Sequence, residues 1–314
     1  MTRVVTRIGQ PYLERCVPQR HLAVRRLRTV GASTQVEGFA MPHFVRHLGI
    51  DYSGAGRADA PLTGLRLFEA ATAPGGIARA RPRGVPAREL RPNPGRGHWT
   101  RRRLAEWLMG TLVESPEPIL VGIDHGFSFP EAYFAAHDLP REWHGFLEDF
   151  CRHWPTDAPD TTVEDLRRSS AAGAARRGGD SRWRRLAEIR SGPAKSVFHF
   201  DVPGSVAKST HAGLPWIRAI GERVGWDRIH VWPFDGWTPR PGRHVLAEVY
   251  PARWNHAMLR DPTHTPDQHD AACVAAALAE ADRSGELESL FKPKLTRSEQ
   301  AQAAYEGWIL GVQP

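Results

Sequence analysis

The chain has 314 residues, of which 41% are hydrophobic, and this is enough for one large domain or two small ones. No apolar run approaches the roughly 18 residues that span a bilayer, so we expect no membrane partner. The three cysteines, Cys16, Cys151 and Cys273, lie far apart and form no CxxC pair. This argues against a zinc ribbon or a disulfide framework and predicts a reducing, cytoplasmic location.

The net charge of +7 is unevenly distributed. Residues 1–40 contain seven arginines and two glutamates and so supply +5 of that charge. Two further stretches, 79–103 and 167–190, are locally basic and are candidates for following a phosphate backbone. Only four of the 42 basic residues are lysines, however, and a G+C-rich coding sequence produces the same excess of arginine. Both interpretations of the basic stretches stay open.

The first 40 residues show no sustained period of 2 or 3.6, and a second methionine, Met41, precedes the first clear strand pattern. We therefore expect a disordered basic leader or an over-extended start at 1–40, and a single folded domain at 41–314. An arginine-rich, acid-poor leader also resembles an organellar transit peptide, but it lacks the apolar core of a secretory signal.

The folded part begins with a pattern of strands. Strands are predicted at 45–51 and 65–70, with a glycine-rich bend at 53–56 between them, and a third is predicted near 87–90. Consecutive strands joined by glycine-rich turns favour an antiparallel start.

A helix and a buried strand follow. Apolar residues at helical spacing predict a helix over 100–114 with Thr100 as its N-cap. The continuous apolar run 119–123 predicts a strand that is buried on both faces. The expected order is therefore β-β-β-α-β.

The second half of the chain is less regular until its last helices. A helix is expected at 143–154, whereas 155–192 is rich in Asp, Ser, Gly and Arg and predicts a mobile insertion or lid. The clearest helix is 265–283, because Thr265 can cap it and Gln268 completes a capping box. The other predicted elements are a helix at 213–224, strands at 228–232 and 244–250, and a helix at 296–305.

Acidic residues recur where several of these elements should converge. Asp51 ends the first strand pattern, Asp124 follows the run 119–123, and Glu248 lies within a later strand. Burying an ionised carboxylate costs several kcal/mol unless a cation or a hydrogen-bond network compensates. Hard divalent cations favour oxygen ligands and catalyse the hydrolysis of phosphate esters, so carboxylates around Mg²⁺ or Mn²⁺ are the simplest explanation.

Two more aspartates lie near the start of the clearest helix. Asp267 and Asp270 are three residues apart, so they project from one face and can reach one ion together. Each acid also has an alternative role without a metal. Acids in a first helical turn complement the helix dipole, Asp51 can bond to the backbone of its turn, Asp124 can cap the next segment, and Glu248 can face solvent or pair with an arginine.

Taken in order, strand-Asp, strand-Asp, strand-Glu and helix-Asp on a β-β-β-α-β framework resemble the ribonuclease H-like superfamily of nucleases and polynucleotidyl transferases. More narrowly, four motifs are similar to the predicted nuclease family catalogued as domain of unknown function 429. They are Gly49-Ile50-Asp51, Gly122-Ile123-Asp124 with its Phe127-Ser128-Phe129-Pro130, Glu248-Val249-Tyr250-Pro251, and Asp267-x-x-Asp270-Ala271. The resemblance spans about 45–311 and includes the closing Glu306-Gly307-Trp308.

The resemblance implies a mixed β-sheet flanked by helices. The chain departs from the superfamily in the long gap between Asp124 and Glu248, where we expect a helical or loop insertion at about 155–192 before the last strands. The resemblance also implies that the carboxylates meet around one or two Mg²⁺ or Mn²⁺ ions and that a nucleic acid, DNA or RNA, is the substrate. Asp51 would bridge two ions, and Asp124, Glu248 and Asp270 would complete the catalytic set, with Asp267 as a further ligand.

Other residues are weaker candidates for function. A histidine near the site could shuttle a proton or simply be a surface residue: the candidates are His125, His264 and His269. Tryptophans could stack on bases or lie in the core, among them Trp99, Trp183, Trp216, Trp232 and Trp237. Lys195 and Lys208 could clamp a phosphate.

Two rival functions also stay open. Actin-like ATPases and sugar kinases place an aspartate in a similar G-I-D strand before a glycine-bearing hairpin, but no second phosphate-binding hairpin is evident in this chain. A non-catalytic module that binds nucleic acid or protein on the same fold is the other alternative.

Overall fold

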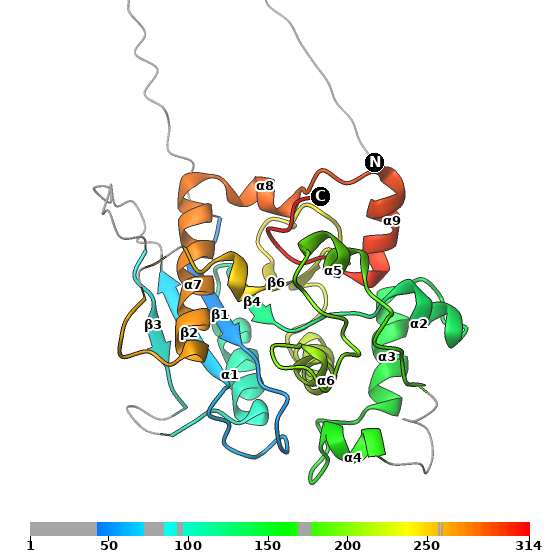
Figure 1. Ribbon diagram of the computed structural model, residues 1–314. Coiled ribbons are helices and arrows are strands. Elements are labelled where there is room, and N and C mark those ends of the chain that lie inside the picture. Colours follow the sequence, from blue (N-terminus) through cyan, green and yellow to red (C-terminus); the bar gives the residue numbers. More distant parts are fainter. Residues whose placement is uncertain (1–42, 72–84, 93–96, 169–176, 257, 259) are drawn as a thin grey trace, which may run out of the picture. The chain divides into compact units, whose positions relative to one another are not determined.

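Within the described part of the chain, six strands form one mixed sheet (Figure 1). The computed structural model describes residues 43–71, 85–92, 97–168, 177–256, 258 and 260–314. The strands are β1 (Arg46–Asp51), β2 (Arg66–Ala71), β3 (Arg88–Leu90), β4 (Ile119–Asp124), β5 (Ile229–Trp232) and β6 (His244–Glu248). Their order across the sheet is β3-β2-β1-β4-β6-β5. The first three strands are antiparallel, whereas β4, β6 and β5 run parallel to β1. The predicted α/β class and antiparallel start are confirmed.

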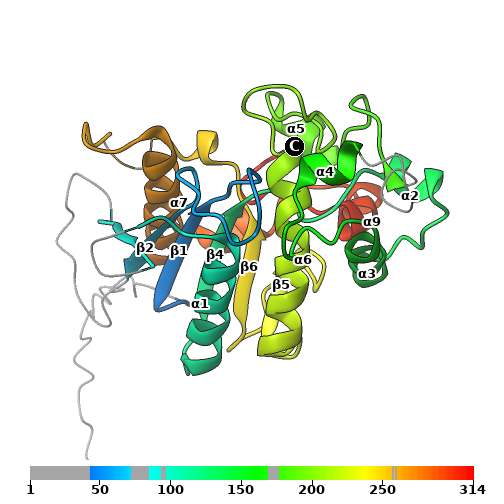
Figure 2. The same cartoon turned by 90° about the horizontal axis from the view of Figure 1, so that it is seen from below.

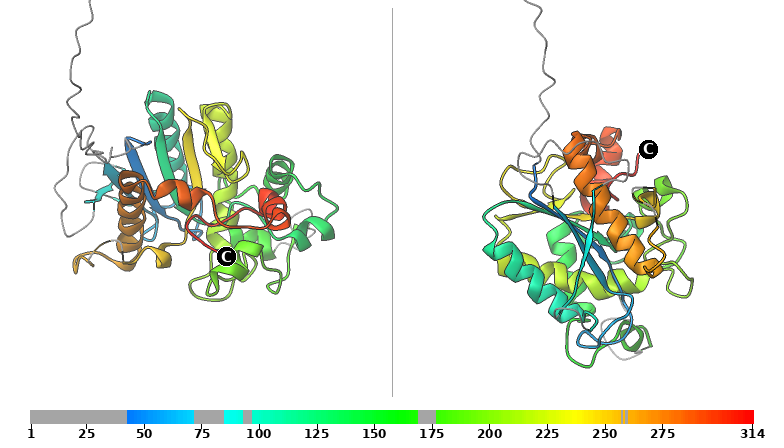
Figure 3. Two further views of the ribbon diagram at one scale, coloured as in Figure 1. Left: turned by 90° about the horizontal axis from the view of Figure 1, so that it is seen from above. Right: turned by 90° about the vertical axis from the view of Figure 1, so that its left-hand side faces the viewer.

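Helices cover both faces of this sheet. One face carries α7 (Pro266–Ser284), which packs over β1 and β2, and the other carries α1 (Arg101–Glu114) and α6 (Ala207–Val224), which contact each other (Figure 2, Figure 3). The remaining helices are α2 (Glu131–Ala136), α3 (Trp143–His153), α4 (Val163–Arg168), α5 (Leu186–Ser191), α8 (Leu287–Phe291) and α9 (Arg297–Glu306), with a 3-10 turn at Pro251–Arg253. None of the helices in the described ranges is both long and apolar enough to cross a membrane.

Local sequence signals set the ends of the helices near the sheet. Thr100 accepts a hydrogen bond from the backbone N–H of Arg103 at 3.1 Å, so the predicted N-cap of α1 is confirmed. Thr265 and Gln268 exchange the two bonds of the predicted capping box, at 3.2 and 2.9 Å. The prediction for α6 was too short, because this helix begins at Ala207 rather than at 213.

The motif after Asp124 fixes the chain against the largest core. The ring of Phe129 lies 5.1 Å from that of Phe146, 5.4 Å from that of Phe150 and 4.6 Å from that of Phe198, centroid to centroid. The hydroxyl of the neighbouring Ser128 donates to the carbonyl of Tyr305 at 2.5 Å. This motif therefore ties the end of β4 to α3 and α9.

The segment at 155–192 differs from its predicted character as a mobile insertion. Within the residues described there, it forms α4 and α5, and Thr156 at its start donates to the carbonyl of His211 on α6 at 2.7 Å. Arg185 and Glu188 near its end are buried. The segment therefore contains short helices and loops, and these two charged side chains are paired inside the fold.

The described residues belong to one compact unit. The predicted leader at 1–40 lies outside them, as do parts of the basic stretches 79–103 and 167–190.

Candidate functional site

Asp51 and Asp124 lie next to each other at the ends of two neighbouring strands. β1 and β4 are parallel, and their register pairs Asp51 with Asp124. Neighbouring strands are about 4.8 Å apart, so the two backbones are held close together. Each aspartate follows a glycine by two residues, Gly49 or Gly122, and residues two apart on a strand share a face. Both side chains therefore lie on the face covered by α7.

The glycines allow α7 to approach these aspartates. A Cβ atom at Gly49 would lie 2.2 Å from the carbonyl oxygen of Ala271 and 2.6 Å from the backbone nitrogen of Ala275. No side chain fits there, so the backbone of α7 rests on that of β1. Asp270 directly precedes Ala271 and is thus brought to the ends of β1 and β4.

The electrostatics of Asp51 show that the aspartates converge. Asp51 is half-buried. Burial and then the charges of Asp124, Asp267 and Asp270 raise its pKa to about 9, and the nearby Arg66 opposes this only in part. Three acids act on Asp51 and one base does, so the free carboxylate is poorly stabilised.

The charged form of Asp124 is also poorly stabilised. Burial and then the charges of Asp270 and Glu248 raise its pKa to about 8. Its Oδ1 atom is buried and accepts no hydrogen bond from any described residue. Burial likewise raises the pKa of Asp270. The cluster therefore favours the arrival of positive charge, as protons or as a cation.

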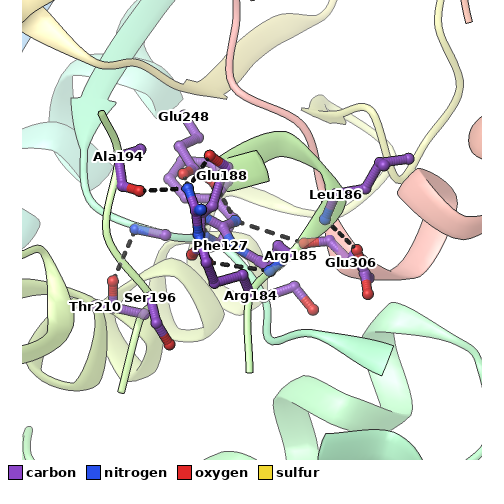
Figure 4. A network of polar contacts seen from close by, with 12 residues as sticks. Phe127, Arg184, Arg185, Leu186, Glu188, Ala194, Ser196, Thr210, Glu248 and Glu306 are labelled. Atoms are coloured by element: carbon purple, nitrogen blue, oxygen red, sulfur yellow. Dashed lines mark hydrogen bonds and ion pairs between the residues drawn. The ribbon is translucent and has the colours of Figure 1, made fainter. Parts of the chain in front are cut away.

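Glu248, by contrast, is neutralised by a partner within the fold. The guanidinium of Arg185 donates to both of its carboxylate oxygens, from Nη1 at 2.7 Å and from Nη2 at 2.6 Å (Figure 4). The backbone N–H of Phe127 donates a third bond at 3.2 Å. The register pairs Glu248 with Ile123, the residue before Asp124, so the two acids are offset along their strands. Pairing with an arginine was one of the alternatives that the sequence left open for Glu248.

Arg185 is the centre of a buried network that sequence reasoning missed. It is fully buried and also donates from Nε to Glu188 at 2.8 Å, while the backbone N–H of Leu186 donates to Glu306 at 2.7 Å (Figure 4). Burial alone would lower the pKa of Arg185, but the charges of Glu248 and Glu188 raise it instead. The i, i+3 spacing of Arg185 and Glu188 is the only local signal of this network.

A second arginine from a basic stretch also has a structural role. Arg101 is fully buried at the start of α1 and donates to the carbonyls of Ala55 at 2.6 Å and Gly56 at 2.8 Å. It thus holds the loop that follows Asp51. Arg101 and Arg185 are thus bound to other parts of the protein and are not available to contact a nucleic acid.

A small cavity of about 20 Å³ adjoins the two clusters. Asp124, Glu248 and Tyr250 line it, together with Lys195. The volume is enough for one water molecule or ion. The Lys195 ammonium on its wall donates to the carbonyl of Pro203 at 2.5 Å. Lys208, the other candidate lysine, pairs with Glu164 at 2.6 Å.

The donor chemistry of the aspartates fits Mg²⁺ or Mn²⁺, because these ions prefer carboxylate oxygens. The unpartnered Oδ1 of Asp124 fits the same role. In the conformation described, however, no three Asp, Glu, His or Cys side chains of the described residues are arranged to hold an ion. The fold brings Asp51, Asp124, Asp267 and Asp270 together. Glu248 lies beside Asp124, where its charge acts on that carboxylate, but it is paired with Arg185.

The three candidate histidines have different surroundings. Burial lowers the pKa of His125 to about 4, and its ring packs on that of Tyr52 at 4.7 Å, as in a core residue. His264 is half-buried against the ring of Phe68, at 5.3 Å. His269 is buried on α7, and its charge acts on Asp270.

The candidate tryptophans divide between core and partial exposure. Trp99, Trp216 and Trp232 are buried, which matches the alternative of a core role. Trp183 and Trp237 are half-buried.

Comparison of the chain with models of known protein families, with curated proteins and with solved structures finds no match. What the site does must therefore be inferred from its residues and their arrangement.

Proposed function

We propose that this protein is a Mg²⁺- or Mn²⁺-dependent nuclease that hydrolyses phosphodiester bonds of a nucleic acid. The observation that best supports this function is the pairing of Asp51 with Asp124 at adjacent strand ends, with Asp270 of α7 close enough for its charge to act on both. These three carboxylates would bind the cation, and Asp267 would bind beside them. A bound divalent cation lowers the pKa of a water molecule and stabilises charge on the phosphate.

The protein residues supply the rest of the site. Without a cation, the aspartates repel one another and retain protons, so a cation that neutralises them is bound in place of those protons. Arg101 fixes the loop after Asp51 and so limits how far that carboxylate can move. Lys195 and Tyr250 line the small cavity beside Asp124 and offer hydrogen-bond donors to a phosphate oxygen. Glu248 joins the ligand set only if it exchanges Arg185 for the cation.

The first experiment measures binding of Mn²⁺ to the full chain by calorimetry and cleavage of single-stranded DNA, duplex DNA and RNA. We expect Asp51→Asn and Asp270→Asn each to reduce cleavage at least about 100-fold, because each removes a carboxylate that acts in the transition state. The circular dichroism spectrum should not change. Asp261→Asn is the matched control, because Asp261 is partly exposed and its carboxylate, among the described residues, contacts Thr263 and His264 alone. Full cleavage by the Asp51 and Asp270 variants would overturn the proposal.

One observation favours a second function, a non-catalytic nucleic-acid-binding module. Glu248 is neutralised by Arg185, and the described residues do not form a complete cation site. A module of this kind would bind nucleic acid equally well with Asp51→Asn and would bind no Mn²⁺. The same titrations therefore separate the two functions.

A further inference from the structure

A cavity of about 390 Å³ lies at the opposite end of the sheet from the aspartates. Phe44, Pro118 and Arg243 line it, and they lie one or two residues before the starts of β1, β4 and β6. These three strands end at the carboxylates of the candidate site. A strand rises about 3.3 Å per residue, so strands of this length place the two sites roughly 15–20 Å apart. The cavity is therefore a separate site.

The size and walls of the cavity suit a small organic ligand. Pockets for such ligands measure about 300–1,000 Å³ and are mainly apolar. The buried side chains of Phe44, Leu287 and Phe291 contribute to the walls. Pro239 and Pro241 form part of the rim, where their rings restrict the backbone.

The apolar wall is held in place by a buried carboxylate. Asp282 of α7 accepts hydrogen bonds from the backbone N–H groups of His43 at 2.8 Å and Phe44 at 2.9 Å, and it contacts the ring of His47 at 2.9 Å. Burial would raise the pKa of Asp282, but these bonds lower it, so the carboxylate stays charged. The cavity is thus formed before any ligand arrives.

The charge on the cavity wall is positive. Arg240 and Arg243 line it, and neither forms an ion pair with a described residue. Glu288, the acid among the described wall residues, is already paired with Lys292 at 2.6 Å. Among the described residues, the two guanidinium groups beside this apolar chamber therefore have no anionic partner.

We propose that this cavity binds a small aromatic anion, a ring system that carries a phosphate, sulfonate or carboxylate group. The ring system packs between Phe44 and Phe291, which favours flat apolar groups. The anionic group accepts charge-assisted hydrogen bonds from Arg240 and Arg243, whose planar guanidinium groups match phosphate and carboxylate geometry. This site is independent of the aspartate cluster and of the function proposed for it.

The test uses 2-naphthyl phosphate and its neutral counterpart 2-naphthol, titrated into the full chain and followed by calorimetry. We expect 2-naphthyl phosphate to bind at least about 10-fold more tightly, because its charged phosphate accepts hydrogen bonds from the guanidinium groups that the neutral compound lacks. Arg240→Ala and Arg243→Ala should each weaken its binding about 10-fold. Both changes are on a surface loop and leave no buried acid unpaired.

Two controls define the location of the site. Arg103→Ala removes an exposed arginine of α1 that does not line the cavity, and Asp51→Asn alters the aspartate cluster. Neither should change the affinity. The proposal is overturned by an absence of saturable binding, by equal affinity for the two compounds, or by unchanged affinity in both arginine variants.

Discussion

Two clusters of buried or half-buried charge adjoin at one end of the sheet, and the fold balances them differently. Around Glu248, Arg185 provides a cation with hydrogen bonds of 2.6–2.8 Å to two glutamates. Around Asp51 and Asp124, acids face acids, and their pKa values rise to about 9 and about 8. The difference indicates which acids stabilise the fold and which are available to an external cation.

Removing Arg185, the cation paired with Glu248 and Glu188, should have the largest effect on stability. Arg185→Ala removes the cation that is paired with the buried Glu248 and Glu188, and breaking a buried ion pair in this way costs about 3–5 kcal/mol. We expect a loss of this size in the free energy of unfolding, measured with urea at pH 8. Arg182→Ala is the control, because its pair with Asp180 is exposed and should not contribute measurably. An Arg185 variant with the wild-type midpoint would show that the network does not stabilise the fold.

A larger side chain at Gly49 should move α7 away from β1 and so separate the aspartates. In Gly49→Ala, the new methyl group would lie 2.2 Å from a backbone oxygen of α7, so the helix must move away from β1. Overpacking of this kind typically costs about 1–3 kcal/mol. We expect thermal unfolding to show this loss and calorimetry to show weaker binding of Mn²⁺, because Asp270 moves away from Asp51.

The matched control for Gly49 is Gly110, within α1. A Cβ atom there would meet nothing within 4 Å, so Gly110→Ala should stabilise the helix by about 0.5–1 kcal/mol. Equal effects of the two substitutions would contradict the close packing of α7 on β1.

The aspartates around Asp51 and Asp124, which no cation of the described residues fully neutralises, should also make the stability of the fold depend on pH. The pKa of Asp124 is about 8 in the folded state and near 4 in the unfolded chain. The folded state therefore holds this proton more tightly, so the contribution of Asp124 to stability is fully present below about pH 4 and is lost as the pH rises towards 8. Asp124→Asn removes this loss, and in EDTA at pH 8 we expect it to stabilise the protein by about 2 kcal/mol, after a discount for solvent screening.

Two further measurements compare the wild type with the Asp124→Asn variant, one at low pH and one with added metal. At pH 4 the Asp124→Asn variant and the wild type should unfold at the same urea concentration. At pH 8, Mn²⁺ should stabilise the wild type but not the variant, because only the wild type has the full set of carboxylates. If the variant and the wild type differ in stability by the same amount at pH 4 and pH 8 without metal, the aspartates do not repel one another as described.

The sequence by itself determined the features that depend on neighbours along the chain. The Thr265–Gln268 capping box, the cap at Thr100 and the antiparallel hairpin of β1 and β2 are of this kind. The G-x-D spacing at Gly49 and Asp51 also belongs here, because side-chain alternation on a strand is local.

Tertiary structure alone decided how the charges are balanced. The bond from Arg185 to Glu248 joins residues that are 63 positions apart. Arg185 lies in the segment 155–192, whose composition predicted a mobile insertion. The same holds for Asp51 and Asp124, whose pairing depends on the register of two strands that are separated along the chain by β2, β3 and α1. An acid and its spacing can be identified in the sequence, but whether a cation lies next to it depends on distances that only the packed chain sets, since electrostatic energy changes steeply with separation and burial.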